Sequence, residues 1–534
     1  MAQEKIGAES QGLSSKAVVL GLSAAFLTYF LYYFMTLGNS IASPMIAADL
    51  NGMDLFSWAI SLPALAMAFA TMLFGKLSDM YGRRSILLTS LVFFVVGAIL
   101  AALSRNFVFN IVARMINGVG MGALAALSFS VVGDLFADPV KRSKWSGLLN
   151  IPAGIAATIV PILIGIIIDN LSWRYFFWAT VPIVIVCMIL IAIGVPGRTG
   201  KVEHKIDYIG AVFLAVASSC MILGVSFTDR QPLVSFHVLG LLVISLVFWI
   251  LFIQIERKVK EPILDPQVFT NRTFLTAAIC AFLSFFGFIG IMNYFPLFLQ
   301  GVHGTSAKIS GAMLTPFSML LAFMGIPAGL LIAKTKKYKW ILVVSYAVLT
   351  AAMFILVLFT RATPLWLGVV VMIFGGIGVG SIPTINVLVV QFALPKRFRG
   401  VSVAAIFFVV ALGMAVAPAI MGPAMNTTYN KKLETLLPKD LDRLISSENL
   451  KSIADPSVLM SANTVKELKS SFSKIEGQKA NLYDETVQAI RGALQSGLKV
   501  VFLIGSVALL IALLFIITIP VVSLDNEAED KNPG

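Results

Sequence analysis

The chain carries fourteen apolar stretches, each long enough to cross a lipid bilayer as a helix. One helical crossing needs roughly 20 apolar residues, and 58% of the 534 residues are hydrophobic, which is enough for all of them. The runs are continuous rather than alternating at every second residue, which excludes a membrane β-barrel. The sequence therefore predicts an all-α polytopic membrane protein with 14 transmembrane helices, at 17–46, 54–76, 85–104, 107–133, 145–168, 173–196, 207–227, 237–255, 273–300, 307–333, 340–359, 363–393, 400–425 and 497–520.

Basic residues alternate from one short loop to the next. The loops after the even-numbered spans are rich in Lys and Arg, whereas the short loops after the odd-numbered spans hold at most one such residue each. Because cationic short loops resist translocation, both tails, residues 1–16 and 521–534, are predicted to be cytoplasmic in a multi-pass protein of the cell membrane. The net charge of +13 reflects this bias and contact with lipid head groups, so we expect the lipid bilayer and no nucleic acid as partner.

Neither an enzyme nor a metal centre is indicated. Cys187, Cys220 and Cys280 lie in apolar spans and the three histidines are scattered, so no metal-ligand spacing is formed. No nucleophile, pair of acids or metal cluster lies at a membrane face. We expect no metal, no cofactor and no enzymatic activity.

Three segments recur at an offset of eight spans. The turn at 75–84 has a degraded counterpart at 329–339, the turn at 136–147 recurs at 392–400, and spans 5 and 13 share a pattern of glycine and proline. The sequence thus predicts a six-plus-two-plus-six arrangement, with bundles at 17–196 and 273–520 and two inserted helices within 197–272. Two six-helix bundles that face each other around a midplane site form an alternating-access transporter.

The most specific string is the turn after span 2, which reads GKLSDMYGRR. Its glycines allow close helix approach and a positive φ in a tight turn. Its Asp can accept hydrogen bonds from backbone N–H groups at the start of a helix, and its arginines can reach carboxylates. The string resembles the loop signature GxLxDxxGRR of the major facilitator superfamily. The resemblance implies a conformational latch on the cytoplasmic face, made of Gly75, Asp79, Gly82, Arg83 and Arg84, with Asp134 at the end of span 4 as an ion-pair partner.

Span 4 places a cation inside the membrane. Arg114, Gly118 and Gly122 recur every four residues and share one face, and the segment resembles the superfamily pattern RxxQGxGxA, with Asn117 where Gln is usual. A charge at this depth costs several kcal/mol unless it faces water or a partner, so a functional role is the first hypothesis. The alternative is an arginine that ties helices together through carbonyl groups.

Span 5 loosely resembles the antiporter signature of the superfamily, of which Gly154, Pro161 and Gly165 remain. Small residues and proline let neighbouring helices pack closely and bend. Fourteen spans, Trp58 and the Trp-Arg pair at 173–174 are also similar to the 14-helix drug:proton antiporter branch. That resemblance implies export of hydrophobic, often cationic compounds driven by inward proton flow.

One feature of that branch is missing. We find no Asp or Glu in the middle of any span, and Met35 stands near the place of the branch's usual acid. The other polar residues inside the spans are neutral, so the cavity should prefer neutral amphiphiles or anions, although each amide could equally join helices. The candidate cavity residues are Arg114, Asn117, Asn39, Ser40, Asn150, Asn293, Tyr294, Asn386 and Gln391.

Residues 426–496 form a polar insert between spans 13 and 14, with ten Lys or Arg against nine Asp or Glu. Apolar residues at helical spacing in 465–472 and 486–494 suggest a small extracellular helical hairpin, either a cap over the outer mouth or a passive insert. The first hypothesis for the whole chain is a monomeric exporter of drug-like or lipid-like amphipathic molecules, with possible proton coupling. The alternatives are a transporter of a small organic anion bound by Arg114, and a receptor or scaffold that uses the outer loop.

Overall fold

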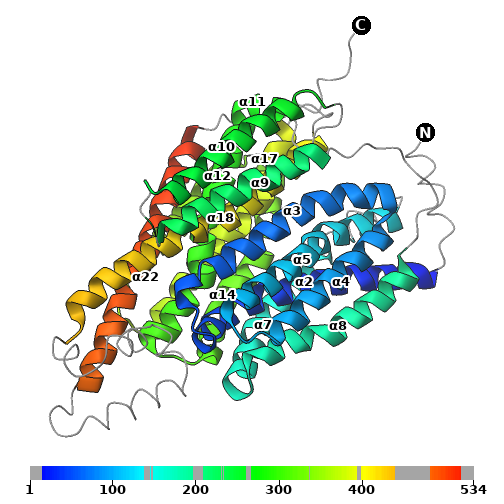
Figure 1. The fold of residues 1–534 in the computed structure, drawn as a ribbon. Coiled ribbons are helices and arrows are strands. Elements are labelled where there is room, and N and C mark those ends of the chain that lie inside the picture. Colours follow the sequence, from blue (N-terminus) through cyan, green and yellow to red (C-terminus); the bar gives the residue numbers. More distant parts are fainter. Residues whose placement is uncertain are drawn as a thin grey trace.

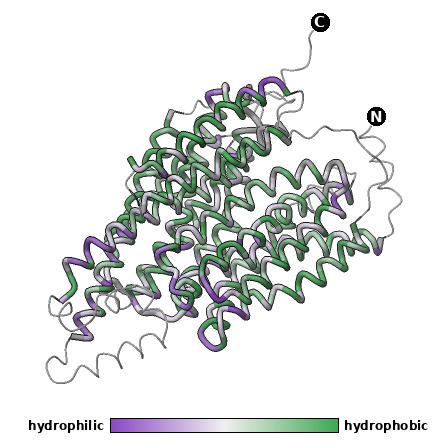
Figure 2. The backbone as a smooth tube through the Cα atoms, viewed as in Figure 1, coloured by the Kyte–Doolittle hydropathy of each residue, from purple (hydrophilic) through white to green (hydrophobic). Residues whose placement is uncertain are grey.

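The computed structural model describes residues 15–136, 145, 148–195, 208–229, 231, 234–259, 266–335, 337–393, 399–438 and 482–518, and all regular structure in these ranges is helical. Long helices lie side by side (Figure 1), and hydrophilic residues gather at the turns and at the outer ends of the last two helices (Figure 2). The α-helices are α2 Ser15–Asp49, α3 Trp58–Tyr81, α4 Arg83–Ala102, α5 Phe107–Leu135, α7 Asn150–Asn170, α8 Trp173–Gly194, α9 Tyr208–Ser226, α10 Phe236–Glu256, α11 Pro266–Thr270, α12 Arg272–Ile289, α13 Phe295–Leu297, α14 Ala307–Phe323, α15 Gly325–Thr335, α16 Lys339–Val357, α17 Leu365–Ala393, α18 Arg399–Leu436 and α22 Leu482–Thr518.

Within the described residues, thirteen helical segments are long and apolar enough to cross a membrane. The seventh predicted span falls on α9, where the stretch Val212–Ser226 is apolar but shorter, so the count of fourteen stays a prediction. The ninth predicted span is a composite, because α12 continues through the π-helical turns η4 (Gly290–Tyr294) and η5 (Phe298–His303) on either side of α13. The tenth is divided into α14 and α15 at Met324.

Successive membrane-crossing helices run antiparallel and define two faces. We call the face at which α2 begins and α22 ends the terminal face, and the opposite one the far face. At the terminal face Gly21 and Gly194 are packed backbone to backbone, and Lys339 donates to the carbonyl of Ile517. At the far face α2 ends beside the start of α8.

Helix pairs of the first half are repeated in the second half. In the first half α5 packs against α2, α3 and α4, and α8 packs against α2 and α4; in the second, α17 packs against α12, α14 and α16, and α22 packs against α12 and α16. The partners in the second set follow those in the first by eight predicted spans. Helices α9 and α10 pack mainly against each other, and α9 also contacts α3 and α18.

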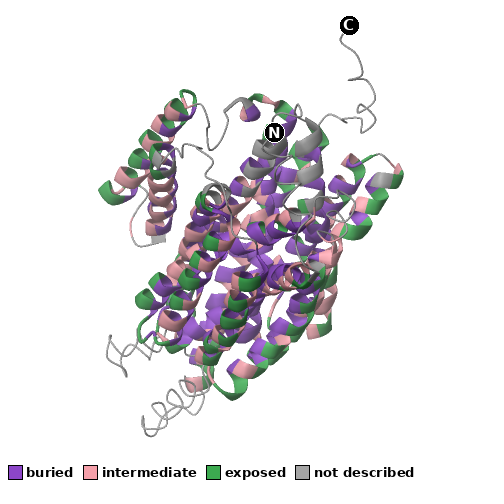
Figure 3. Ribbon diagram, turned by 90° about the vertical axis from the view of Figure 1, so that its right-hand side faces the viewer, coloured by how far each residue is buried: buried purple, intermediate pink, exposed green. Residues whose placement is uncertain are grey.

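The halves meet along two seams. One joins α7 to α14 and the other joins α3 to α18. The two seams are related by the same repeat, because α18 follows α7, and α14 follows α3, by eight predicted spans. Buried residues fill the middle of the helix array and exposed ones lie on its rim (Figure 3). Many exposed residues are large and apolar, such as Val243, Leu246 and Ile250 on α10. An apolar rim of this kind is suited to lipid rather than to water.

Helices α18 and α22 are longer than the predicted spans 13 and 14. They have 38 and 37 residues, about 55 Å each at 1.5 Å per residue, whereas the hydrocarbon core of a bilayer is about 30 Å thick. They project together from the far face (Figure 1), and an added Cβ on Gly492 would lie 3.3 Å from Leu436. The predicted helix at 486–494 is confirmed as part of α22, whereas 465–472 lies outside the described residues.

Candidate functional site

Arg114 is the centre of the candidate site. The side chain of Asn106 caps the start of α5 by accepting from Phe109 N at 2.7 Å, and Arg114 follows two turns later. Its side chain is only 5% exposed. The Nη2 atom donates to Ser43 Oγ on α2 at 3.2 Å, and Ser43 Oγ donates to the carbonyl of Asn39 at 2.6 Å.

The guanidinium is only partly satisfied. Its Nε and Nη1 atoms are buried and have no hydrogen-bond partner among the described residues. One turn before Ser43 on α2, Asn39 Oδ1 is also buried and also has no hydrogen-bond partner among the described residues. Leaving the donors of a buried cation without hydrogen-bond partners costs several kcal/mol. Asn39, Ser43 and Arg114, which we call the Arg114 cluster, therefore offer hydrogen bonds to a polar or negatively charged partner.

Two predicted cavity residues bind elsewhere. Asn117 Nδ2 donates to the carbonyl of Phe94 on α4 at 2.8 Å, and Ser40 Oγ donates to Leu37 O within α2 at 2.6 Å. Asn117 is therefore a tie between α4 and α5, which is the alternative that the sequence left open for each amide. Arg114, three residues earlier, bonds to Ser43 on α2 instead, so the two polar side chains contact different helices.

The remaining predicted cavity residues lie on other helices. Tyr294 is fully buried, and its ring is in edge contact with Phe56 of the first half, with centroids 5.6 Å apart. Asn293 lies beside it in η4 and is partly exposed, and Asn386 is buried in α17 with its Oδ1 unpaired among the described residues. Asn150 and Gln391 belong to α7 and α17, but their side chains lie outside the described residues.

Sequence reasoning does not find Gln300. It is 3% exposed in η5, and its Nε2 donates to the carbonyl of Ile41 on α2 at 3.5 Å, so it crosses from the second half to the first. The available signal is a single amide in the last position of predicted span 9, where a polar residue is expected to face water or head groups.

The predicted ion pair beside the latch motif is present. Arg83 Nε lies 2.6 Å from Asp134 Oδ2, which links the start of α4 to the end of α5 at the terminal face. Gly82 has φ +86°, a conformation that favours glycine. Gly75 differs from the prediction, because an added Cβ there would meet no atom of the described residues within 4 Å. Arg84 is half-buried, and the side chain of Asp79 lies outside the described residues.

The glycines of spans 4 and 5 do pack closely. On α5, an added Cβ would lie 2.5 Å from Pro63 O at Gly118 and 2.6 Å from Ala70 Cβ at Gly122. The seam between α7 and α14 is equally tight, since an added Cβ would lie 2.0 Å from the ring of Phe323 at Gly154 and 2.6 Å from the carbonyl of Ala307 at Gly165. Pro161 contributes its carbonyl to the same seam, opposite Gly311.

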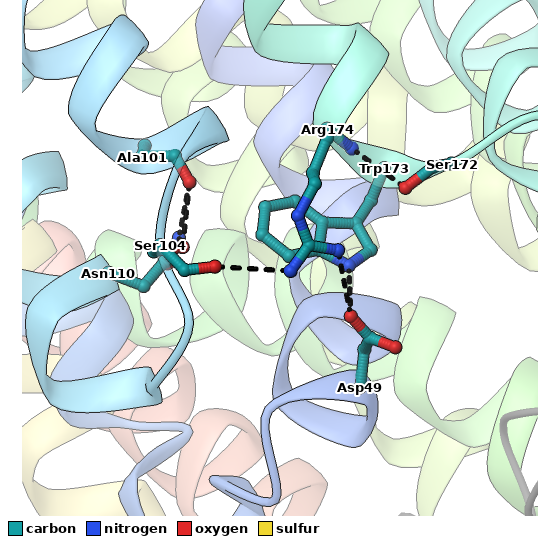
Figure 4. Close-up of polar contacts among 7 residues, drawn as sticks. All are labelled: Asp49, Ala101, Ser104, Asn110, Ser172, Trp173 and Arg174. Atoms are coloured by element: carbon teal, nitrogen blue, oxygen red, sulfur yellow. Dashed lines mark hydrogen bonds and ion pairs between the residues drawn. The ribbon is translucent and has the colours of Figure 1, made fainter.

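A polar cluster joins three helices of the first half at the far face (Figure 4). Asp49 Oδ2 at the end of α2 accepts from Trp173 Nε1 at 2.9 Å and pairs with Arg174 Nη1 at 3.1 Å. The guanidinium of Arg174 also stacks over the Trp173 ring and donates to Ser104 O between α4 and α5. Asn110 in turn donates to Ser104 Oγ at 2.9 Å. The Trp-Arg pair at 173–174 therefore joins the ends of α2, α4 and α8.

A lateral groove of about 590 Å³ opens between α2, α7 and α8. Its lining is almost wholly apolar and includes Phe26, Phe30, Trp145 and Ile155. It does not include the Arg114 cluster. The described residues contain no group of three or more His, Cys, Asp or Glu that could hold a metal ion.

Residues 25–418 match the Major Facilitator Superfamily. Over 504 residues the chain is 30% identical to "Multidrug resistance protein 3" of Bacillus subtilis (strain 168), an alignment that covers 93% of this chain and 94% of that protein. It is 28% identical over 517 residues to "Multidrug transporter protein MdtP" of the same organism, with 93% of each chain covered. A bacterial homologue of the human lysosomal transporter Spinster, solved inward-facing and unoccupied, has the same fold, with a TM-score of 0.63 at 14% identity over 95% of this chain and 98% of that one. With this match, its helical architecture and its relatives, the chain belongs to the major facilitator superfamily of membrane transporters.

Proposed function

We propose that this protein is a secondary active transporter that exports hydrophobic or amphipathic molecules, neutral or anionic at the polar end, by alternating access. The observation that carries the substrate class is the Arg114 cluster. A buried guanidinium with two nitrogens that have no partner among the described residues attracts a carbonyl, hydroxyl or carboxylate group and repels a second cation. The names of the bacterial relatives support efflux of drug-like compounds.

The two seams support the movement. At both seams a neighbouring helix approaches a glycine closely: Gly311 faces Pro161 O between α7 and α14, and Gly422 faces Ser57 between α3 and α18. Glycine surfaces allow close helix contact with few side-chain obstacles to sliding. The repeated helix pairs on either side of the seams support two bundles, at 17–196 and 273–520, that rock as units with α9 and α10 as inserted helices.

The proposed setting is the cell membrane, with a monomer whose terminal face is cytoplasmic and whose far face is outside. The cationic loops of the terminal face support this orientation. In it, the Arg83–Asp134 pair joins the cytoplasmic ends of α4 and α5 within the first bundle. Proton coupling is part of the proposal, as exchange of an inward proton for an outward substrate.

The test is flux in proteoliposomes that hold the full chain. Efflux of a neutral or anionic amphipathic dye should exceed efflux of a matched cationic dye, and an imposed pH gradient should accelerate it. Arg114→Met should abolish this flux while the protein remains at least as stable, because a buried charge with unmade hydrogen bonds is removed. Arg114→Lys keeps the charge and is the matched control for the guanidinium geometry.

The outcomes separate the candidates. Loss of stability in Arg114→Met with flux retained would show that Arg114 only ties helices together, and would refute the substrate proposal. The second candidate is a carrier of small organic anions, which the same unpaired nitrogens favour. It predicts that a short carboxylate without an apolar part competes with the dye, whereas an exporter of amphiphiles should ignore it.

A further inference from the structure

A carboxylate of the first half caps a helix of the second half. Asp169 lies at the end of α7 on the far face, and its two oxygens accept from the backbone N–H groups of Ala307 and Lys308, at 3.0 and 2.8 Å. These are the first two residues of α14. We propose that Asp169 holds the two halves together at the far face and that the far face opens only when this carboxylate leaves the start of α14. The inference rests on the alternating access proposed above.

The contact is a strong one for its position. The first N–H groups of a helix have no partner within the helix, and the helix dipole places positive charge there. The side chain of Ser306 already accepts a hydrogen bond from Ile309 N, at 3.4 Å. The carboxylate of Asp169 accepts hydrogen bonds from the first two N–H groups of α14, and hydrogen bonds to a charged acceptor are roughly twice as strong as neutral ones. One turn earlier Gly165 brings α7 against the carbonyl of Ala307, which puts Asp169 within reach.

The two ends of this seam differ in chemistry. Toward the terminal face, α7 and α14 meet through Gly154 and the ring of Phe323, an apolar contact without direction. At the far face they meet through two directed, charged hydrogen bonds. The other seam is joined at the far face by Asn426 Nδ2, which donates to the carbonyl of Asp54 at 3.1 Å. Opening of the far face must break the Asp169 bonds, whereas opening of the terminal face can leave them in place. Asp169 is therefore a positioning residue that favours the state closed at the far face.

The chain offers matched variants. Asp169→Ala removes both acceptors, and Asp169→Asn keeps one neutral carbonyl. Asn170→Ala is the control, because Asn170 is the next residue, is also exposed and donates only to Ile166 of its own helix at 2.9 Å. From the other side, Ala307→Pro deletes one N–H. Proline is favoured at the first helical position, and Ser306 has ψ 161°, which fits a residue before proline.

The readout is the distance between spin labels on the two halves, in lipid nanodiscs without substrate. Arg105 and Arg361 lie exposed in far-face turns of the first and second half, and each is replaced by a labelled Cys after the native cysteines are changed to Ala. We expect Asp169→Ala to raise the ratio of open to closed far face about tenfold, after allowance for the exposure of the pair. Asp169→Asn should raise it less, and Asn170→Ala should leave it unchanged.

Ala307→Pro should also raise the ratio and should add little on top of Asp169→Ala, because both remove the same contact. Unchanged distances in Asp169→Ala, or an equal change in Asn170→Ala, would overturn the proposal. If Asp169→Ala does not fold, Asp169→Asn and Ala307→Pro provide the same test, and unchanged distances in both would overturn it. Because no substrate is present, a shift in distance without any flux would refute the proposed transport and leave the Asp169 contact established.

Discussion

Gly311 on α14 makes the closest approach to the backbone of the other half, and replacing it is the sharpest test of the seams. A Cβ added at Gly311 would lie 2.0 Å from the carbonyl oxygen of Pro161 and 2.6 Å from its carbon, and real Cβ contacts essentially never fall below 3.0 Å. The obstacle is helix backbone, which cannot rotate away as a flexible side chain could. Gly311→Ala must therefore separate α7 from α14 by about 1 Å or more at this level.

The expected cost follows from this displacement. Overpacking by a methyl group costs about 1–3 kcal/mol, and exchange of Gly for Ala within a helix returns up to about 1 kcal/mol. The net loss of about 1–2 kcal/mol falls on the closed seam, which re-forms in every cycle of the proposed alternating access. We expect a maximal flux reduced about fivefold or more, since each 1.4 kcal/mol is a factor of about ten.

Gly329→Ala is the matched control, because an added Cβ there meets no atom of the described residues within 4 Å and only the helix preference changes. Both variants are assayed for dye flux in proteoliposomes and for apparent melting temperature in the same detergent. We expect Gly311→Ala to be slower and less stable than the parent and Gly329→Ala to match or exceed it. Equal behaviour of the two would refute the argument that glycine sets the distance between α7 and α14.

Three further predictions concern single contacts. Asp134→Asn should lower the free energy of unfolding by only about 0.5–1 kcal/mol, because the pair with Arg83 is partly exposed, and thermal unfolding measures this loss. Asp49→Asn keeps an acceptor for Trp173 and should be milder in melting temperature than Asp49→Ala, which loses that bond as well as the pair with Arg174. Gln300→Leu should leave the melting temperature unchanged or raise it. The variant loses the 3.5 Å hydrogen bond to Ile41 O, but it also removes the buried Oε1, which has no partner among the described residues.

The spans can be predicted from sequence because the bilayer dictates their length and composition. The departures are local changes of helix type within an apolar run. The π-helical turns around 290–303 and the break at Met324 leave the apolar pattern intact, so hydropathy cannot reveal them. The extensions of α18 and α22 lie beyond the length that crosses a bilayer, so their composition is polar and hydropathy does not mark them, although the apolar spacing at 486–494 does indicate helix.

The candidate site is predictable in part. A cation within an apolar run must find a partner, which makes Arg114 visible, and the spacing of the latch motif anticipates the pair between Arg83 and Asp134. The sequence does not show that Asn117 faces α4 rather than the predicted cavity, because nothing in an apolar helix marks which side packs against which neighbour. Nor does it reveal the role of Asp169, an acid at the end of a span, since its two donors lie 138 and 139 residues away along the chain.

The continuous course of α18 has a mechanical consequence. The same helix forms one seam with α3 and then leaves the far face beside α22. In the proposed rocking of the second half, the tip of α18 lies further from the seam than the part that packs on α3, so the tip travels further. The tip therefore amplifies the proposed movement. An antibody fragment that clamps the tip to the rest of the far face would arrest the cycle without touching the substrate path.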